Sequence, residues 1–227
     1  MLIQNKGKMR TIKHPFFILL TTTVGIFYSC DQREDKIKVA CIGDSITEGY
    51  GIEKANEHSY PFVLQTLLGD GYSVLNAGRS STTLQKNGNH PYSYSKEFSN
   101  VFMFEPDIIV VSLGTNDTKP INWVNSEIFQ RDYQFLLDTL KQIKSRPKIY
   151  VCTPVPVFNS SWGINDSTLV HGIIPVVKRL TSEHHINLID LNHIFEDKNE
   201  LTSDGIHPNE LGARAIAEQV FNEIHPH

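Results

Sequence analysis

The sequence predicts an α/β domain in which helices cover both faces of a parallel sheet, a three-layer α/β/α architecture running from about Lys36 to the end of the chain. Three observations predict it. Short apolar segments recur along the chain, stretches with helical spacing separate them, and two of the short segments are continuously apolar, as strands buried on both faces are. Strands alternating with helices form βαβ units, whose crossovers are right-handed.

The predicted strands are five short apolar segments: 37–42, 74–76, 108–113, 149–152 and 187–191. The predicted helices show apolar residues at helical spacing. They cover 62–68, 133–143, 169–180, whose start is uncertain because of Gly172 and Pro175, and 213–224, with Asn209 as its N-cap.

Two long connections, 79–106 and 153–167, follow the second and fourth predicted strands. Loops of this length in a compact domain are usually functional or disordered. Both leave the carboxyl ends of strands, where open α/β sheets bind ligands. We therefore expect them to form the walls of a site.

The N-terminal region does not resemble the rest of the domain. A basic stretch precedes an uncharged run over 16–28, too short to span a membrane comfortably and typical of a secretory signal peptide. Cys30, at the end of this run, resembles the lipid-attachment cysteine of bacterial lipoproteins, although Phe27 and Tyr28 depart from that pattern. We expect a signal peptide over 1–30, a linker over 31–36 and the folded domain over 37–227. The product would be exported, held at the periplasmic or cell surface by a lipid on Cys30. A plain cleaved signal and an uncleaved anchor stay open.

Composition narrows the function. The chain has 227 residues, 40% of them hydrophobic, and a net charge of −4, so it carries no electrostatic footprint for nucleic acid. Cys41 and Cys152 lie in apolar strand-like segments and are expected to be buried, with neither a disulfide nor a metal site. The sequence does not predict an oligomeric state.

Four polar motifs stand at predicted strand ends or far down the chain: Gly43-Asp44-Ser45, Asn76-Ala77-Gly78, Gly114-Thr115-Asn116-Asp117 and Asp204-Gly205-Ile206-His207. A serine, a base and an orienting acid are the minimum parts for acyl transfer through a covalent intermediate. In this interpretation Ser45 attacks a carbonyl carbon, His207 takes the proton and Asp204 fixes the imidazole tautomer. The N–H groups of Ser45 and Gly78 and the side-chain amide of Asn116 are the expected oxyanion donors. Asp44 and Asp117 are expected to hold loops.

These four motifs, in this order, resemble the SGNH hydrolases, also called the GDSL family, over essentially the whole chain after the signal. The departure is small, since Ile46 stands where the family name has leucine. The resemblance implies a flavodoxin-like sheet of about five parallel strands, no metal or cofactor, and hydrolysis of esters. Exported members of this size often resemble carbohydrate acetylesterases, which implies an acylated, mainly acetylated, carbohydrate substrate.

Aromatic residues on the two long loops are candidates for contact with sugar rings, chiefly Trp162 and Tyr92. Arg79 has two possible roles: its side chain contacts a carboxylate of the substrate, or it contacts an acidic residue on the protein surface. The second is favoured. Three alternatives remain: a lysophospholipase or thioesterase acting on lipids, a sugar-binding lipoprotein without activity, and, least favoured, a metal-dependent phosphoesterase using Gly88-Asn89-His90.

Overall fold

The computed structural model describes residues 1–2, 35–159 and 161–225. The predicted signal peptide with Cys30, and most of the predicted linker 31–36, lie outside the described residues. The elements, in order, are β1 (Ile37–Gly43), α1 (Ser45–Glu48), α2 (Ala55–His58), α3 (Tyr60–Leu68), β2 (Tyr72–Gly78), η1 (Tyr92–Tyr94), α4 (Lys96–Phe104), β3 (Ile108–Ser112), η2 (Asn116–Thr118), α5 (Ser126–Leu140), β4 (Lys148–Cys152), η3 (Ser161–Gly163), α6 (Asp166–Thr168), η4 (Leu169–Ile173), α7 (Ile174–Glu183), β5 (Asn187–Ile189), α8 (Leu191–Ile194), η5 (Asn199–Leu201) and α9 (Glu210–Ile224).

The five strands form one parallel sheet in the order β2-β1-β3-β4-β5. This is the flavodoxin-like order, so the predicted fold class is confirmed. The chain leaves β1 toward β2 on one side, then returns across β1 to β3 on the other. The switch point between β1 and β3 is where such sheets bind ligands, and both Ser45 and Asn116 lie just beyond these two strands.

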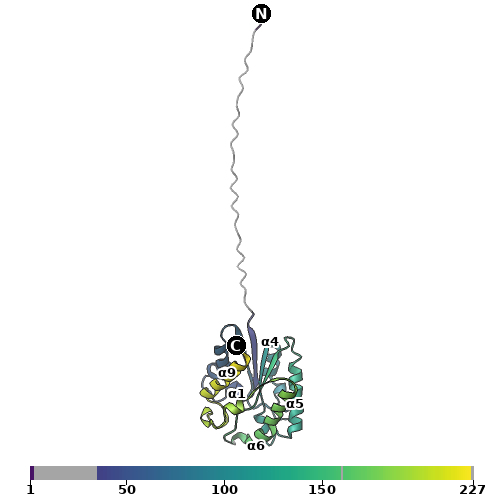
Figure 1. Cartoon of the computed structure of the whole chain (residues 1–227), viewed down its shortest axis with the longest axis vertical. Helices are drawn as coiled ribbons and strands as arrows, with labels where there is room; N and C mark the ends of the chain where they lie inside the picture. Colours follow the sequence, from purple (N-terminus) through teal and green to yellow (C-terminus); the bar gives the residue numbers. More distant parts are fainter. Residues whose placement is uncertain (3–34, 160, 226–227) are drawn as a thin grey trace. The chain divides into compact units, whose positions relative to one another are not determined.

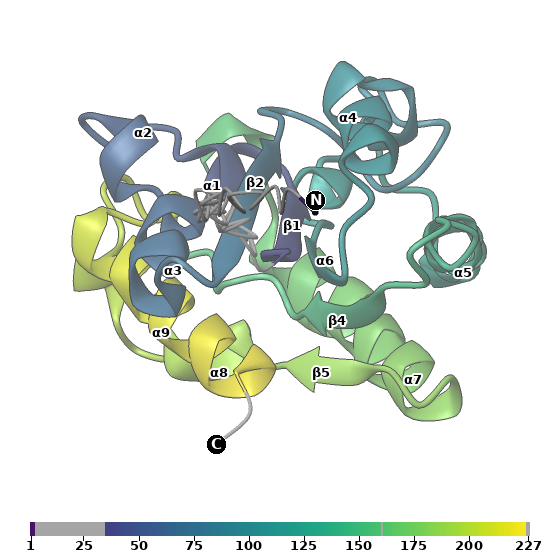
Figure 2. The same cartoon turned by 90° about the horizontal axis from the view of Figure 1, so that it is seen from above.

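Side chains alternate along each strand, so the sheet supports two cores. Ala40 and Ile42 of β1 pack toward α4, α5 and α7, whereas Val39 and Cys41 pack toward α3 and α9. Figures 1 and 2 show the two helical layers, with α9 and α3 over one face of the sheet and α4 and α5 over the other. Cys41 and Cys152 are fully buried and unpaired, as predicted.

The main departure from the predicted elements is inside the connection 79–106, which contains η1 and the helix α4. Phe98, Val101 and Phe102 have helical spacing and face the core, and Ser95 caps the helix by accepting the Phe98 N–H at 3.0 Å. The apolar stripe is short and follows the charged residues Lys96 and Glu97, so the sequence pattern did not predict the helix α4. Within residues 1–2, 35–159 and 161–225 no helix has the length and apolar character needed to cross a membrane.

Candidate active site

Ser45 is placed by a sharp strand-to-helix turn. The buried Asp44 side chain caps α1, with Oδ1 accepting the Ile46 N–H at 3.0 Å, so Asp44 serves the loop as expected. Gly43 is required at the turn because a Cβ there would lie 1.9 Å from the Thr47 Oγ1. Ser45 is therefore held, half-buried, at the carboxyl end of β1.

Ser45, His207 and Asp204 come together although 162 positions separate the first two. The Ser45 Oγ lies 3.0 Å from the His207 Nε2, and the His207 Nδ1 lies 2.8 Å from the Asp204 Oδ2. The other Asp204 oxygen accepts the backbone N–H groups of Ile206 and His207. Burial opposes the charge of Asp204, but these hydrogen bonds and the neighbouring imidazole hold its pKa below the usual range.

A small cavity of about 80 Å³ opens beside these groups. Its walls come from distant parts of the chain: Ser45, Tyr50, Ser81, Asn116, Trp162 and His207, together with Ser80, Lys119 and Ile164. Residues from both long connections contribute, so the expectation that these connections wall the site is confirmed. Burial lowers the pKa of the half-buried Lys119, against the effect of the Asp44 charge.

Asn116, one of the predicted oxyanion donors, lines the cavity. Its side chain is 3% exposed, and its Nδ2 is buried without a hydrogen-bond partner among the described residues. Burying an amide N–H without a hydrogen-bond partner costs free energy. A substrate group that places an acceptor in this cavity can form the missing hydrogen bond with the Asn116 Nδ2. The backbone carbonyl of Asn116 accepts a hydrogen bond from the Asn122 Nδ2 at 2.9 Å.

Contrary to the prediction, Gly78 does not line the cavity. Its N–H donates to the Asn76 Oδ1 at 2.9 Å, and a Cβ at Gly78 would lie 2.2 Å from the Glu48 nitrogen. The missing side chain thus serves the close packing of β2 against α1 rather than access to the site. Ser81, three residues later, lines the cavity instead, in a left-handed conformation with φ of 67°.

The segment that carries Ser81 is tied down from several sides. The Glu48 carboxylate accepts both the N–H and the hydroxyl of Ser80. Asp117, fully buried, accepts the N–H groups of Leu84 and Gln85, each at 2.8 Å, and is the loop-holder that the sequence predicted. Burial raises the pKa of Asp117 to about 7 and that of Asp44 to about 6, and hydrogen bonds to each carboxyl limit the rise.

Two aromatic rings lie near His207, one in contact with it and the second against the first. The Tyr50 ring lies 4.6 Å from the His207 ring, and Trp162 meets the Tyr50 ring edge-on at 6.3 Å. Trp162 is 63% exposed and adopts a left-handed backbone with φ of 62°, which is uncommon for a bulky residue. Its position supports the predicted contact with substrate.

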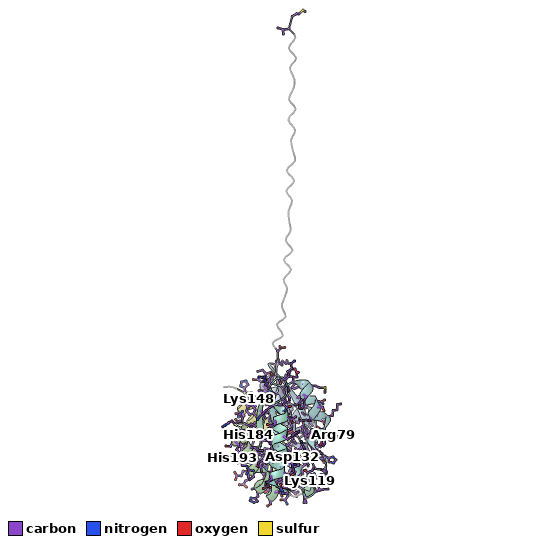
Figure 3. The ribbon with its side chains drawn as sticks, turned by 90° about the vertical axis from the view of Figure 1, so that its right-hand side faces the viewer. Arg79, Lys119, Asp132, Lys148, His184 and His193 are labelled. Atoms are coloured by element: carbon purple, nitrogen blue, oxygen red, sulfur yellow. The ribbon has the colours of Figure 1, made fainter. Side chains whose placement is uncertain are left out.

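The other two predicted substrate residues fare differently. The prediction for Tyr92 is wrong, because its side chain is buried in the core at 1% exposure and its hydroxyl donates to the Ala77 carbonyl at 2.6 Å. Arg79 lies outside the small cavity but lines a wider one, of about 350 Å³, which shares Ser80 and Ser81 with it. Figure 3 labels Arg79 and Lys119 on one flank of the domain, and His184 and His193 toward the other.

Several site residues escaped the sequence analysis: Tyr50, Ser80, Ser81, Lys119 and Ile164. All of them lie within a few residues of a recognised motif or inside a long connection. Their position in the chain could have indicated that they line the site. Their residue types could not, because ordinary loop residues have the same side chains. Asn89 and His90, considered as metal ligands, line the wider cavity, and the described residues contain no group of three His, Cys, Asp or Glu side chains that could hold a metal ion.

Comparison with known proteins matches residues 41–215 to the GDSL-like Lipase/Acylhydrolase family. The chain is 39% identical over 210 residues to an acetylxylan esterase of Xylanibacter ruminicola, an alignment covering 85% of this chain and 44% of that protein. It is 24% identical over 224 residues to a multidomain esterase of Ruminococcus flavefaciens, covering 83% of this chain and 28% of that one. The chain thus spans less than half the length of these curated relatives.

Among solved structures, an acetyl xylan esterase superposes with a TM-score of 0.66 at 25% identity, covering 83% of this chain and 100% of that one. The matched range of the family model, residues 41–215, contains Ser45, Asn116 and His207. The chain therefore belongs to the GDSL-like lipase/acylhydrolase family.

Proposed function

We propose that this protein is a serine esterase that removes acetyl groups from carbohydrates. One observation carries the proposal: the Ser45–His207–Asp204 hydrogen-bonded chain, with contacts of 3.0 and 2.8 Å, opens onto a cavity that holds the unpartnered Asn116 amide. A nucleophile, its base, an orienting acid and an oxyanion donor then meet at one point. The resemblance to acetylxylan esterases supports the substrate class.

In the first half-reaction the Ser45 Oγ forms a bond to the carbonyl carbon while its proton passes to the His207 Nε2. Asp204 accepts from the His207 Nδ1 and stabilises the imidazolium. The Asn116 Nδ2 and the N–H groups of Ser45 and Ser81 stabilise the oxyanion. Collapse breaks the C–O bond of the ester, and the departing sugar oxygen takes the proton from His207 and leaves as a hydroxyl. Water then attacks the acyl-serine by the same route and releases the acid and free Ser45.

The size of the site favours a short acyl group. The cavity beside Ser45 is about 80 Å³, well below the volume that a drug-sized ligand requires, and Trp162 and Ile164 bound it on one side. A sugar on the alcohol side of the ester then lies toward the exposed Trp162 ring and the wider cavity. This geometry disfavours long acyl chains and hence the lipid-esterase alternative.

Acetate release from acetylated xylo-oligosaccharides, together with hydrolysis of p-nitrophenyl acetate and octanoate, tests the proposal. We expect turnover of the acetylated substrates and a preference for acetate over octanoate. Ser45→Ala should lower kcat by at least about a thousandfold, as loss of a triad nucleophile does, while the exposed Ser182→Ala retains wild-type turnover. Preference for octanoate would favour a lipid esterase. Sugar binding without hydrolysis of any ester would identify a binding protein.

We also propose that the chain is exported and held at a membrane by a lipid on Cys30. The basic stretch, the uncharged run and the cysteine at its end support this proposal. Metabolic labelling with a fatty acid should label the wild type and not the Cys30→Ala variant. Absence of label on the wild type, or label that survives the substitution, would exclude lipidation at this residue.

A further inference from the structure

The wider cavity beside the active site, here called the Arg79 groove, is built by the segment that follows β2. Arg79, Ser80, Ser81, Asn89, His90 and Tyr94 are among its lining residues. Ser80 and Ser81 belong to both cavities, so the groove is continuous with the site of Ser45. A substrate chain whose ester reaches Ser45 can therefore extend a neighbouring unit into the groove.

The charge of the groove is one-sided. Arg79 is exposed and forms no ion pair with any carboxylate of the described residues, and no acidic residue lines the groove there. Two acids lie on the elements packed against it. Glu48 is occupied by Ser80, and Glu97 lies in the first turn of α4 without an ion pair. A free guanidinium is suited to bidentate recognition of a carboxylate.

The remaining lining has the chemistry of a sugar subsite. The Tyr94 side chain is 76% exposed, which leaves its ring available for packing against a pyranose. Hydroxyl and amide groups of Ser80, Ser81 and Asn89 stand beside it. An aromatic face, neutral hydrogen-bonding groups and one cation without an ion pair among the described residues together match a sugar that carries a carboxylate, that is, a uronic acid.

The backbone of the groove is held in place by hydrogen bonds. The Arg79 N–H donates to the Gly43 carbonyl at 3.0 Å, which fixes its backbone to the end of β1, and its carbonyl accepts the Thr82 hydroxyl at 2.7 Å. The Thr83 N–H donates to the His90 carbonyl, and the Asn89 N–H donates to the Asn122 Oδ1, both at 2.9 Å. Preorganisation of this kind reduces the entropic cost of binding.

We propose that the Arg79 groove binds a uronic acid unit of the substrate, so that the preferred substrates are acetylated polysaccharides with acidic side groups. This inference rests on the proposed esterase function and specifies its substrate. Arg79 accordingly acts as a specificity residue: it pairs with the substrate carboxylate while Ser45 attacks an acetyl ester on a neighbouring unit.

The test compares acetate release from two acetylated xylo-oligosaccharides, one neutral and one carrying a uronic acid side group. At low ionic strength we expect the wild type to prefer the acidic substrate by about tenfold in kcat/KM, mainly through KM, as one charge-assisted bidentate contact in a partly exposed site provides. Arg79→Gln should reduce this ratio to about one, and Arg79→Lys should give an intermediate ratio. Arg214→Gln, which removes an equal charge on α9, should keep the wild-type ratio.

A second measurement needs no variant. The wild-type preference should fall toward one as salt is raised from about 0.05 to 0.5 M, because the Debye length shortens. A wild type without preference, a preference that persists in Arg79→Gln, or one insensitive to salt would overturn the inference. Failure of the proposed function is distinguishable, since the wild type would then release acetate from neither oligosaccharide and would not hydrolyse p-nitrophenyl acetate.

Discussion

The two walls of the active-site cavity are built in opposite ways. The braced wall, residues 79–95, is held by buried polar side chains: Asp117 accepts two of its N–H groups and Asp132 accepts the Lys86 N–H at 2.9 Å. The aromatic wall consists of Tyr50, Trp162 and Ile164: the Tyr50 and Trp162 rings meet edge-on at its surface, where Trp162 is 63% exposed, and Ile164 packs in a small apolar cluster. One wall is polar and buried at its base, while the other is apolar and open to solvent.

The contrast indicates a division of labour. Oxyanion donors work only when their positions are fixed before the charge develops, so they belong on a rigid, fully hydrogen-bonded support. A sugar varies in orientation from one ester position to the next, and an exposed ring accommodates it without strict geometry. Changes at the oxyanion donors and the buried supports of the braced wall should therefore act on kcat, whereas changes at the exposed Trp162 of the aromatic wall should act on KM.

Asn116, at the start of the η2 turn that supports the braced wall, should give the largest effect. Asn116→Ala removes the buried donor and should lower kcat by about 10²- to 10³-fold with little change in KM, because the oxyanion exists only after attack. Steady-state kinetics on p-nitrophenyl acetate measure the two constants separately. An unchanged kcat, or a loss confined to KM, would remove Asn116 from the oxyanion site.

Asp117→Asn tests the brace itself. An amide in place of the carboxylate leaves one of the two N–H groups, of Leu84 or Gln85, facing a donor. We expect a loss of about 1–3 kcal/mol in the free energy of unfolding and a reduced kcat. Asp138→Asn, on the exposed surface of α5, is the matched control and should change neither quantity.

Asp117→Asn should also change how the stability of the protein depends on pH. Burial raises the folded-state pKa of Asp117 from 3.8 to about 7, so the folded protein binds a proton here that the unfolded chain releases. The stability from this group is complete below about pH 4 and is lost as pH rises through about 7. Thermal unfolding between these limits should depend less on pH in Asp117→Asn than in the wild type. An equal pH dependence in both proteins would contradict the assignment.

Trp162→Ala should give the smallest effect and a different kind. Loss of the ring should raise KM for acetylated xylo-oligosaccharides by up to about tenfold, the scale of one aromatic contact, and should change kcat for p-nitrophenyl acetate much less. Trp162→Tyr, which keeps a ring at the position, should recover most of the affinity. If Trp162→Ala instead reduced kcat on both substrates alike, the division between the walls would be lost.

The sequence was sufficient where chemistry follows local pattern. Continuous apolar runs predicted the strands, and strand ends carrying Ser45 and Asn116 placed two site residues near one rim, because parallel strands present their carboxyl ends on the same edge. It failed where a residue's role depends on its neighbours in space. Gly78 has the right residue type for an oxyanion donor, yet the absence of a side chain there allows the backbone of α1 to pack against β2. Tyr92 is an aromatic loop residue like Trp162, but α4 encloses it in the core.

The Tyr50 ring bears on the proton relay itself. Its centroid lies 4.6 Å from that of the His207 ring, within the range in which an aromatic face attracts a cation. In the proposed mechanism the imidazole is positively charged after it has taken the proton from Ser45. The attraction, about 0.5–1 kcal/mol at an exposed position, would then favour that charged intermediate. On this mechanism a surface tyrosine outside the hydrogen-bonded triad would help to lower the barrier.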